Sequence, residues 1–461
     1  MSDRLSGTVN ILVPVGALGV GVREKDLDAG IAAGAHAIAL DAGSTDSGPA
    51  YLATGKSKYS RGAIKADLTL LMKAQAKAGI PLLIGSCGTS GCDMALDWTA
   101  DIVREIASEL GLNPKISLLY SEQRAEDMLS REGAITPLAP ITDVETAAFE
   151  ACEHIVALMG PEPYIAALEA GADIVLGGRT TDTAVIAAVP LMRGAGAGPS
   201  WHAGKIAECG GQCTANSRDG GVMIRVGKDA FEIEPLSQTN RCEPYSVSAH
   251  LLYENSNPTR LLEPGGVLDV SAARYIAVDD RVVRVEGSRF EVAPYTMKLE
   301  GASRGDFQTI MLVGICDPKV LAQIDLFVRQ MHGLLCSRVD AAMGKAAGDY
   351  HISLRPYGWN AVLDDPVPET EPQPREIGLL FVATAASQEI ATQIAKTCNP
   401  AFFHMPLRPE FELPSYAFPF SPSEIERGQV FEFRLNHVVA VADGLERVRI
   451  VHEFIEEAEH A

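Results

Sequence analysis

The stretch IALDAGSTDSGPAYLATG (residues 38–55) combines the two features that decide the fold. It opens with an apolar run typical of a buried strand, and Asp41 ends that run. Gly, Ser, Thr and Pro follow, together with a second carboxylate, Asp46. In an open α/β sheet, ligands bind beyond the carboxyl ends of the strands. We therefore interpret Asp41 and Asp46 as the rim of a binding crevice.

The same alternation continues on both sides of this stretch. Apolar runs predict strands at 10–16, 36–41, 81–86 and 115–120, and Ala/Leu-rich segments predict helices at 24–34, 61–79 and 95–111. Strands that alternate with helices are typical of βαβ units and a parallel sheet. For residues 1–190 we predict an α/β fold, a doubly wound and mostly parallel sheet of about six strands with helices on both faces.

The remaining sequence divides into two regions. Residues 191–300 are rich in glycine and short alternating runs, which predicts a β-rich or irregular connecting segment. In residues 301–461 the hydrophobic pattern predicts strands at 307–315, 350–358, 376–385 and 431–441, and helices at 318–335 and 387–397. That βαββαβ order is typical of a ferredoxin-like α+β domain.

Composition excludes several classes of partner. The 461 residues include 39 basic and 60 acidic side chains, a net charge of −21, and no dense run of Lys or Arg, which argues against nucleic acid. No apolar stretch of about 18 residues occurs, so we expect no membrane partner. The N-terminus is too polar for a signal peptide, and the nine cysteines suit a reducing compartment, so we expect a cytoplasmic protein.

Polar, glycine-rich loops follow four of the predicted strands, at 15–21, 41–49, 85–92 and 177–182. We expect these loops to meet in one crevice, because parallel strands end at one edge of a sheet. Ser86, Thr89 and Ser90 would form an anion-binding nest before a helix, or only a tight turn. Arg179 would bind a carboxylate or phosphate through its fork of N–H groups, or only pair with Asp182 at the next helix start.

A second polar cluster lies in AECGGQCTANSRDGG (207–221), which carries Glu208, Cys209 and Gln212. A thiol nucleophile at Cys209 would need a neighbouring base to lower its pKa. Zinc at the C-x-x-x-C spacing would need more ligands than His202 offers, so no metal site is assigned.

Two pairs in other segments complete the candidates. His250 and Glu254 stand at i and i+4 on one predicted helical face, as a general-base pair or as an ordinary capped helix. Arg355 and Asn360 in RPYGWN add polar groups late in the chain.

The glycines of VGALGVG (15–21) could also be compared with a dinucleotide fingerprint. Asp41 lies 20 residues beyond the last of them, as a ribose-binding acid would. The spacing is G-x-x-G-x-G, whereas the fingerprint requires G-x-G-x-x-G. An NAD(P)-dependent reductase is therefore kept only as an alternative.

Several motifs, taken in order, resemble one known family. They are GALGVG, DAGSTDSGPAYL, GGRTTD, ECGGQC, AHLLYEN, EPGG, YTMKLEGA, RPYG and ATAASQE. From about residue 10 to 440 the chain resembles the acyclic terpene utilisation (AtuA-like) family, although His250 replaces the polar pair usual at that place. The resemblance implies bacterial catabolism of a branched isoprenoid acid or of its acyl-CoA thioester.

These observations predict a catabolic enzyme that acts on a small hydroxy or unsaturated carboxylic acid, or on an acyl-CoA, by proton transfer next to the carbonyl. Isomerase, hydratase and lyase all remain open, no cofactor is required by the sequence, and we expect a homo-oligomer. A non-catalytic binding or scaffold subunit that needs a small partner protein is the alternative. Loss of Arg179 is expected to abolish turnover and leave the melting temperature nearly unchanged. The catalytic candidates are Asp41, Asp46, Glu208, Cys209, His250 and Glu254, and the binding candidates are Ser86, Thr89, Ser90, Arg179, Asp182, Gln212, Arg355 and Asn360.

Overall fold

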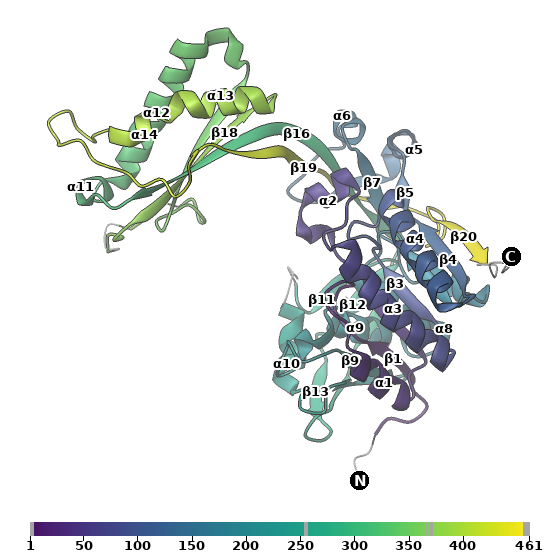
Figure 1. Cartoon of the computed structure of the whole chain (residues 1–461). Coiled ribbons are helices and arrows are strands. Elements are labelled where there is room, and N and C mark those ends of the chain that lie inside the picture. The colour runs from purple at the N-terminus through teal and green to yellow at the C-terminus, as the bar shows by residue number, and fades with distance from the viewer. Residues whose placement is uncertain (1–3, 253–256, 366, 369–371, 455–461) are drawn as a thin grey trace. The chain divides into compact units, whose positions relative to one another are not determined.

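The computed structural model describes residues 4–252, 257–365, 367–368 and 372–454. The chain is a mixed α/β protein with several sheets, one of them containing both parallel and antiparallel strands (Figure 1). It divides into two compact units, the first formed by residues 1–303 and 433–461 and the second by residues 304–432. No helix within the described ranges is long and apolar enough to cross a membrane.

The first unit is built on a mixed sheet of ten strands, counted over the described residues. Its centre is parallel, with strands in the order β1, β2, β3, β8, β4, and Asp41 at the end of β2 lies beside Gly85 at the end of β3. The carboxyl ends of these strands therefore share one edge. The central strands are β1 (Val9–Val13), β2 (Ala37–Asp41), β3 (Leu82–Gly85), β8 (Ile174–Gly177) and β4 (Lys115–Tyr120).

Antiparallel strands extend this sheet on both sides. Residues 191–300, for which we expected a connecting segment, supply the flank beside β1. The sheet is thus wider and more mixed than the parallel sheet of about six strands that the alternation predicted, while the division at residues 190 and 300 and the doubly wound class stay predictions. The flanking strands are β9 (Val222–Val226), β10 (Ala230–Pro235), β14 (Val283–Glu286) and β13 (Arg274–Ala277) on one side and β20 (Arg449–Phe454) on the other.

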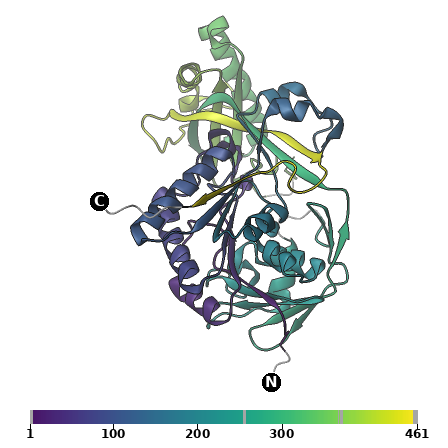
Figure 2. The same ribbon diagram turned by 90° about the vertical axis from the view of Figure 1, so that its right-hand side faces the viewer.

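Helices cover both faces of the central strands (Figure 2). Leu12 and Ile38 pack with Leu68 on one face, and Ile11 packs with Val185 on the opposite face, because successive residues of a strand point to opposite sides. Each face thus has its own apolar core. The first face carries α1 (Glu24–Ala32), α3 (Arg61–Ala78) and α4 (Asp93–Leu110), and the second carries α7 (Glu162–Glu169), α8 (Asp182–Met192) and α9 (Ala197–Ala207).

Short elements fill the rest of the first unit. β7 pairs with β5 and with the first part of β16, and Glu300 lies on that part of β16. These elements are α2 (Pro49–Thr54), β5 (Glu122–Gln123), α5 (Ala125–Leu129), β6 (Ile135–Pro137), α6 (Thr146–Glu150), β7 (His154–Ala157), α10 (Pro244–Ala249), β11 (Arg260–Glu263), β12 (Gly266–Asp269), β15 (Arg289–Val292), and the 3₁₀ turns at Thr45–Ser47, Gly210–Cys213 and His250–Leu252.

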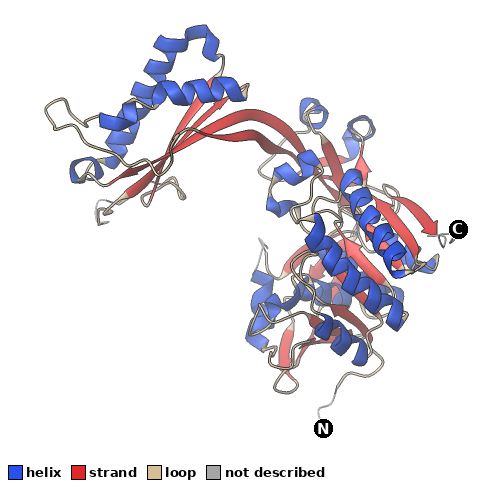
Figure 3. Cartoon of the chain, in the orientation of Figure 1, coloured by secondary structure: helices blue, strands red, loops and turns tan. Residues whose placement is uncertain are grey.

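In the second unit, helices pack on one face of an antiparallel sheet, with Phe327 and Ile394 against Met311 and Phe381 (Figure 3). The strand order is β17, β18, β16, β19, and the ferredoxin-like class stays a prediction. The helix expected at 318–335 is two helices. The elements are β16 (Thr296–Ile315), α11 (Pro318–Leu321), α12 (Ile324–Met343), β17 (Tyr350–Tyr357), β18 (Ile377–Ala385), α13 (Gln388–Cys398), α14 (Ala401–His404) and β19 (Ile425–Ala440), of which β16 and β19 run through both units.

Candidate functional site

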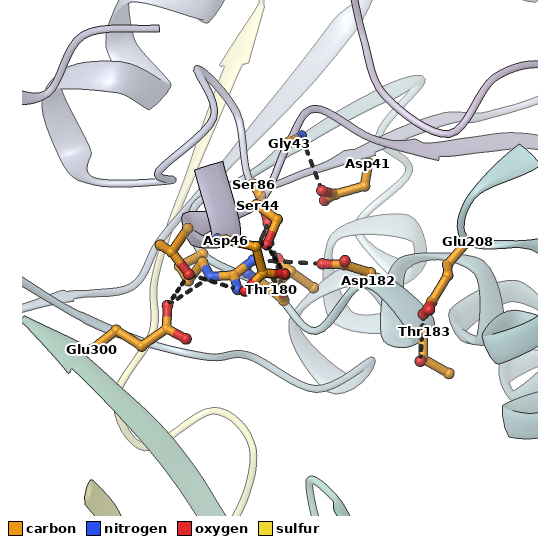
Figure 4. Close-up of polar contacts among 12 residues, drawn as sticks. Asp41, Gly43, Ser44, Asp46, Ser86, Thr180, Asp182, Thr183, Glu208 and Glu300 are labelled. Carbon is orange, nitrogen blue, oxygen red and sulfur yellow. Dashed lines mark hydrogen bonds and ion pairs between the residues drawn. The ribbon is translucent and has the colours of Figure 1, made fainter. Parts of the chain in front are cut away.

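Loops from neighbouring strands meet at the guanidinium of Arg179, which follows β8. Its Nη1 donates to Ser86 Oγ (3.1 Å) in the loop after β3, and its Nη2 donates to Thr45 Oγ1 (3.2 Å) in the loop after β2. Its Nε donates to Glu300 Oε2 (3.0 Å), and Nη1 also lies 3.4 Å from Asp182 Oδ1. The loops after β2, β3 and β8 therefore come together, tied by one side chain (Figure 4).

The Arg179 network is a buried set of charges. Arg179 is only 5% exposed, and Glu300 also accepts from the Thr45 hydroxyl (2.8 Å) and from Lys298 Nζ (3.0 Å). Burial would raise the pKa of Glu300, but the charges of Arg179 and Lys298 lower it to about 2. Removing Arg179 would leave the buried Glu300 with Lys298 as the remaining charge beside it, so we now expect the loss of Arg179 to lower the melting temperature. The guanidinium holds the loops in place rather than standing open to a ligand.

Asp41 lies beside this network and is 3% exposed. Its Oδ2 accepts from the Gly43 amide (3.0 Å), whereas Oδ1 has no hydrogen-bond partner among the residues described. Burial first, and then the charge of Asp182, raise the pKa of Asp41 well above its ordinary value. A Cβ at position 85 would lie 2.6 Å from Oδ1, which explains why glycine stands there. We interpret Asp41 as a buried carboxyl group whose surroundings favour its neutral form.

A polar cavity of about 430 Å³ adjoins the network on its Asp182 side. Lys205 and Glu208 from α9 enter it, together with Glu263 at the end of β11. Lys205 Nζ contacts Glu208 Oε1, and the Thr183 hydroxyl donates to Glu208 Oε2 (3.2 Å; Figure 4). The cavity thus presents carboxyl groups around one ammonium group.

Burial raises the pKa values of these carboxyl groups and so favours their neutral forms. It raises the pKa of Glu208 to about 8, with the ammonium of Lys205 opposing the rise and Asp182 adding to it. It also raises the pKa of Glu263 to about 7, with the same two neighbours acting in the same directions. Burial would lower the pKa of Lys205, but Glu208 raises it above its ordinary value, so Lys205 stays charged. Glu208 and Glu263 can therefore give and take protons near pH 7.

An apolar cavity of about 290 Å³ continues from the polar one. Leu158, Thr181, Leu262 and Glu263 line both cavities, so the carboxyl group of Glu263 stands where they join. The walls further in are mostly apolar, with Val267 among them. Together the cavities offer a polar end with acid–base groups and an apolar end.

Three of the predicted catalytic residues lie close together. One ligand atom each from Glu208, Cys209 and His250 falls within 4.8 Å of the others. Burial, and then the charge of Lys205, lower the pKa of His250 to about 4, so its imidazole is neutral at pH 7. Glu254 lies outside the described residues.

Cys209 faces a different cavity, of about 370 Å³, which it shares with Gln212 and the loop after β1. Gly16 of that loop lies against the backbone of Cys209, where a Cβ would come within 2.6 Å of the carbonyl carbon. The loop after β1 therefore belongs to another cavity than Arg179, which corrects the expectation of a single crevice for all four loops.

The predicted anion nest after β3 and the glycine-rich loop after β1 both bind groups of the protein itself. In the loop after β1, the amides of Gly19 and Val22 each donate to the Asp67 carboxylate at 2.8 Å. In the loop after β3, Thr89 Oγ1 accepts from a backbone amide (3.0 Å) and Ser90 Oγ donates to Cys92 Sγ (3.4 Å), and both residues are fully buried. These N–H and hydroxyl groups are engaged before any phosphate arrives.

Other predicted residues lie apart from the cavities. Asp46 is exposed and its Oδ2 accepts from the Ser44 hydroxyl (2.8 Å). Arg355 and Asn360 belong to the second unit, with Arg355 exposed on β17. His202 is fully buried and hydrogen-bonds elsewhere in the core, 2.7 Å from a serine hydroxyl, so it adds no ligand to Cys209.

Sequence reasoning missed Thr45, Lys205, Glu263 and Glu300. Lys205 could have been found, because it stands three residues before Glu208 in a helical segment, where the two side chains are neighbours. Glu263 and Glu300 stand in EPGG and YTMKLEGA, motifs that the resemblance had already singled out. Thr45 likewise stands in DAGSTDSGPAYL, another of those motifs.

Comparison with known proteins agrees with these motifs. The model of the acyclic terpene utilisation family protein AtuA matches residues 50–409, a range that includes Arg179, Lys205, Glu208 and Glu263. No curated protein and no solved structure matches the chain.

Proposed function

We propose a function that rests on one premise: the chain belongs to the acyclic terpene utilisation family AtuA. The match of that family's model to residues 50–409 establishes this membership. The family's name refers to the utilisation of acyclic terpenes, which supports a catabolic role. Within that role we propose an enzyme that moves a proton next to the carbonyl of a branched unsaturated acid or its acyl-CoA thioester. Double-bond isomerisation, hydration and elimination on such a substrate all include such a step.

The observation that carries this proposal is the pair of carboxyl groups around Lys205, the buried Glu208 and the half-buried Glu263. Their pKa values of about 8 and about 7 leave one group ready to donate a proton and the other ready to accept one near pH 7. We assign the proton transfer to these two residues. The ammonium of Lys205 would stabilise negative charge as it develops on the carbonyl oxygen.

The adjoining cavities would orient the substrate. Its carbonyl would enter the polar cavity, and its branched hydrocarbon chain would lie in the apolar cavity beyond Glu263. The volumes of about 430 and 290 Å³ suit a small molecule rather than a polymer. Arg179 takes a positioning role, since its N–H groups hold Ser86, Thr45 and Glu300.

Deuterium exchange tests the proposal without knowledge of the final product. The purified chain is incubated in D₂O with branched β,γ-unsaturated acyl-CoA thioesters and with the matching free acids, in which the carbon next to the carbonyl carries acidic hydrogens, and these hydrogens are followed by proton NMR. We expect deuterium exchange with at least one of these substrates. The exchange rate should fall by about 100-fold or more in Glu208→Gln and in Glu263→Gln, because a general acid or base usually contributes a factor of this size.

Glu162→Gln serves as the matched control. Glu162 is another carboxyl group whose pKa burial raises, and it lines neither the polar nor the apolar cavity. Its substitution should leave exchange within about twofold of the native rate, because it makes no contribution to the chemistry. Exchange that survives in both cavity variants would contradict the assignment, and exchange that requires an added partner protein would support a scaffold role instead.

A further inference from the structure

A second group of metal-ligating side chains lies beyond the ends of β3 and β4, apart from the cavities described above. Cys92 directly precedes α4, Glu122 lies on β5, and His154 begins β7. One ligand atom from each of these residues falls within 4.8 Å of the other two. Because about 30 residues separate consecutive members along the chain, the tertiary fold and not the local sequence brings them together.

Contacts behind these side chains fix their direction. His154 Nδ1 lies 2.6 Å from Glu122 Oε1, and the other oxygen of Glu122 accepts the amide of Asp93 (2.7 Å) at the start of α4. Ser90 Oγ donates to Cys92 Sγ (3.4 Å), and Cys92 is fully buried. Metal ligands are typically oriented by hydrogen bonds of this kind from neighbouring groups.

The charges around the group favour a cation. Glu122 and Asp93 bring two carboxyl groups, and Asp93 Oδ1 is buried with no hydrogen-bond partner among the residues that the structure describes. Arg449 contacts the other oxygen of Asp93 at 3.5 Å and does not reach Glu122 in any described ion pair. With His154 bound as a neutral imidazole and Cys92 as the sulfur ligand, the carboxylates of Glu122 and Asp93 would still give this group of side chains excess negative charge.

We propose that Cys92, Glu122 and His154 bind a zinc ion. Zinc takes sulfur, nitrogen and carboxylate ligands in tetrahedral sites, whereas calcium and magnesium require oxygen ligands only. Bonds of about 2.0–2.2 Å to nitrogen and oxygen would need His154 Nδ1 and Glu122 Oε1 to separate by less than an ångström. On binding, the Cys92 thiol and Nδ1 of His154 both release a proton, and the ion ties the start of α4 to β5 and β7.

Cobalt titration tests the site, because a thiolate bound to Co²⁺ gives a charge-transfer absorption that other ligands do not. The full chain is stripped with a chelator and titrated with Co²⁺, then with Zn²⁺ in competition. We expect one Co²⁺ per chain, a thiolate absorption band, and displacement of the cobalt by zinc. Cys92→Ser should abolish the band, and His154→Ala should weaken cobalt binding by at least about tenfold.

Cys209→Ser is the matched control, because Cys209 belongs to the other cluster of Cys, His and Glu side chains. It should retain the band in full. No band in the native chain would overturn the proposal, and so would a band that survives in Cys92→Ser and disappears in Cys209→Ser. If Cys92→Ser does not fold, Glu122→Gln and His154→Gln, checked by circular dichroism, decide the outcome by the same titration.

Discussion

Replacing Arg179 with alanine should destabilise the first unit strongly. The guanidinium holds the buried Glu300, whose pKa falls from its ordinary 4.5 to about 2 in the folded protein. At about 1.36 kcal/mol per pH unit, that lowering of the pKa corresponds to about 3 kcal/mol of stability, shared between Arg179 and Lys298. Loss of one partner of a buried ion pair generally costs about 3–5 kcal/mol, so we expect about 3 kcal/mol or more at pH 7.

The pH dependence gives this prediction a second signature. Because the folded pKa of Glu300 lies below the unfolded value, its contribution is present above pH 4.5 and is lost as the pH falls from 4.5 toward 2. Without Arg179, much of that contribution is lost, because Lys298 and the Thr45 hydroxyl alone continue to stabilise the charged form. The difference in unfolding free energy between native and variant protein should therefore narrow below pH 4.5.

Urea unfolding at pH 7 and at pH 4, followed by circular dichroism, measures both effects. Arg124→Ala is the matched control, because Arg124 makes an exposed ion pair with Glu126 that is worth at most about 1 kcal/mol. An Arg179→Ala protein as stable at pH 7 as Arg124→Ala would refute the view that the guanidinium is a buried support for the loops.

Other predictions concern single positions in the same unit. Glu208 has a folded pKa of about 8, above its ordinary 4.5, so the native protein should lose stability as the pH rises from 4.5 through 8, and Glu208→Gln should flatten that decline in thermal melts. Gly85→Ala would place a Cβ 2.6 Å from Asp41 Oδ1 and should cost about 1–3 kcal/mol, whereas Gly62→Ala, with no atom within 4 Å, should be neutral or stabilising in the same urea assay.

Local signals in the sequence were enough to predict many elements. The strand predicted at 115–120 is β4 (Lys115–Tyr120), and the helices expected to end at Gly79 and Gly111 do so, because both glycines adopt the left-handed backbone that ends a helix. These signals lie within a few residues of the element they mark, so a single sequence contains them.

Contacts between segments that are far apart in the chain could not be predicted from the sequence alone. Glu300 stands 121 residues from Arg179, and the strands around residues 222–235 join the sheet beside β1 only through pairing across the chain. The sequence identified Arg179 as a cation near a strand end, but whether its N–H groups were free or already occupied depends on those distant partners. The raised pKa values of Glu208 and Glu263 also depend on distant segments, because burial by those segments is their largest cause.

The pH profile of deuterium incorporation next to the substrate carbonyl tests the central claim most directly. With a branched acyl thioester that exchanges, the native protein should show a limb with an apparent pKa near 8, set by Glu208, which is absent from whatever rate remains in Glu208→Gln and unchanged in Glu162→Gln. A native profile that is flat between pH 6 and 9, or a limb near pH 8 that persists in Glu208→Gln, would contradict it.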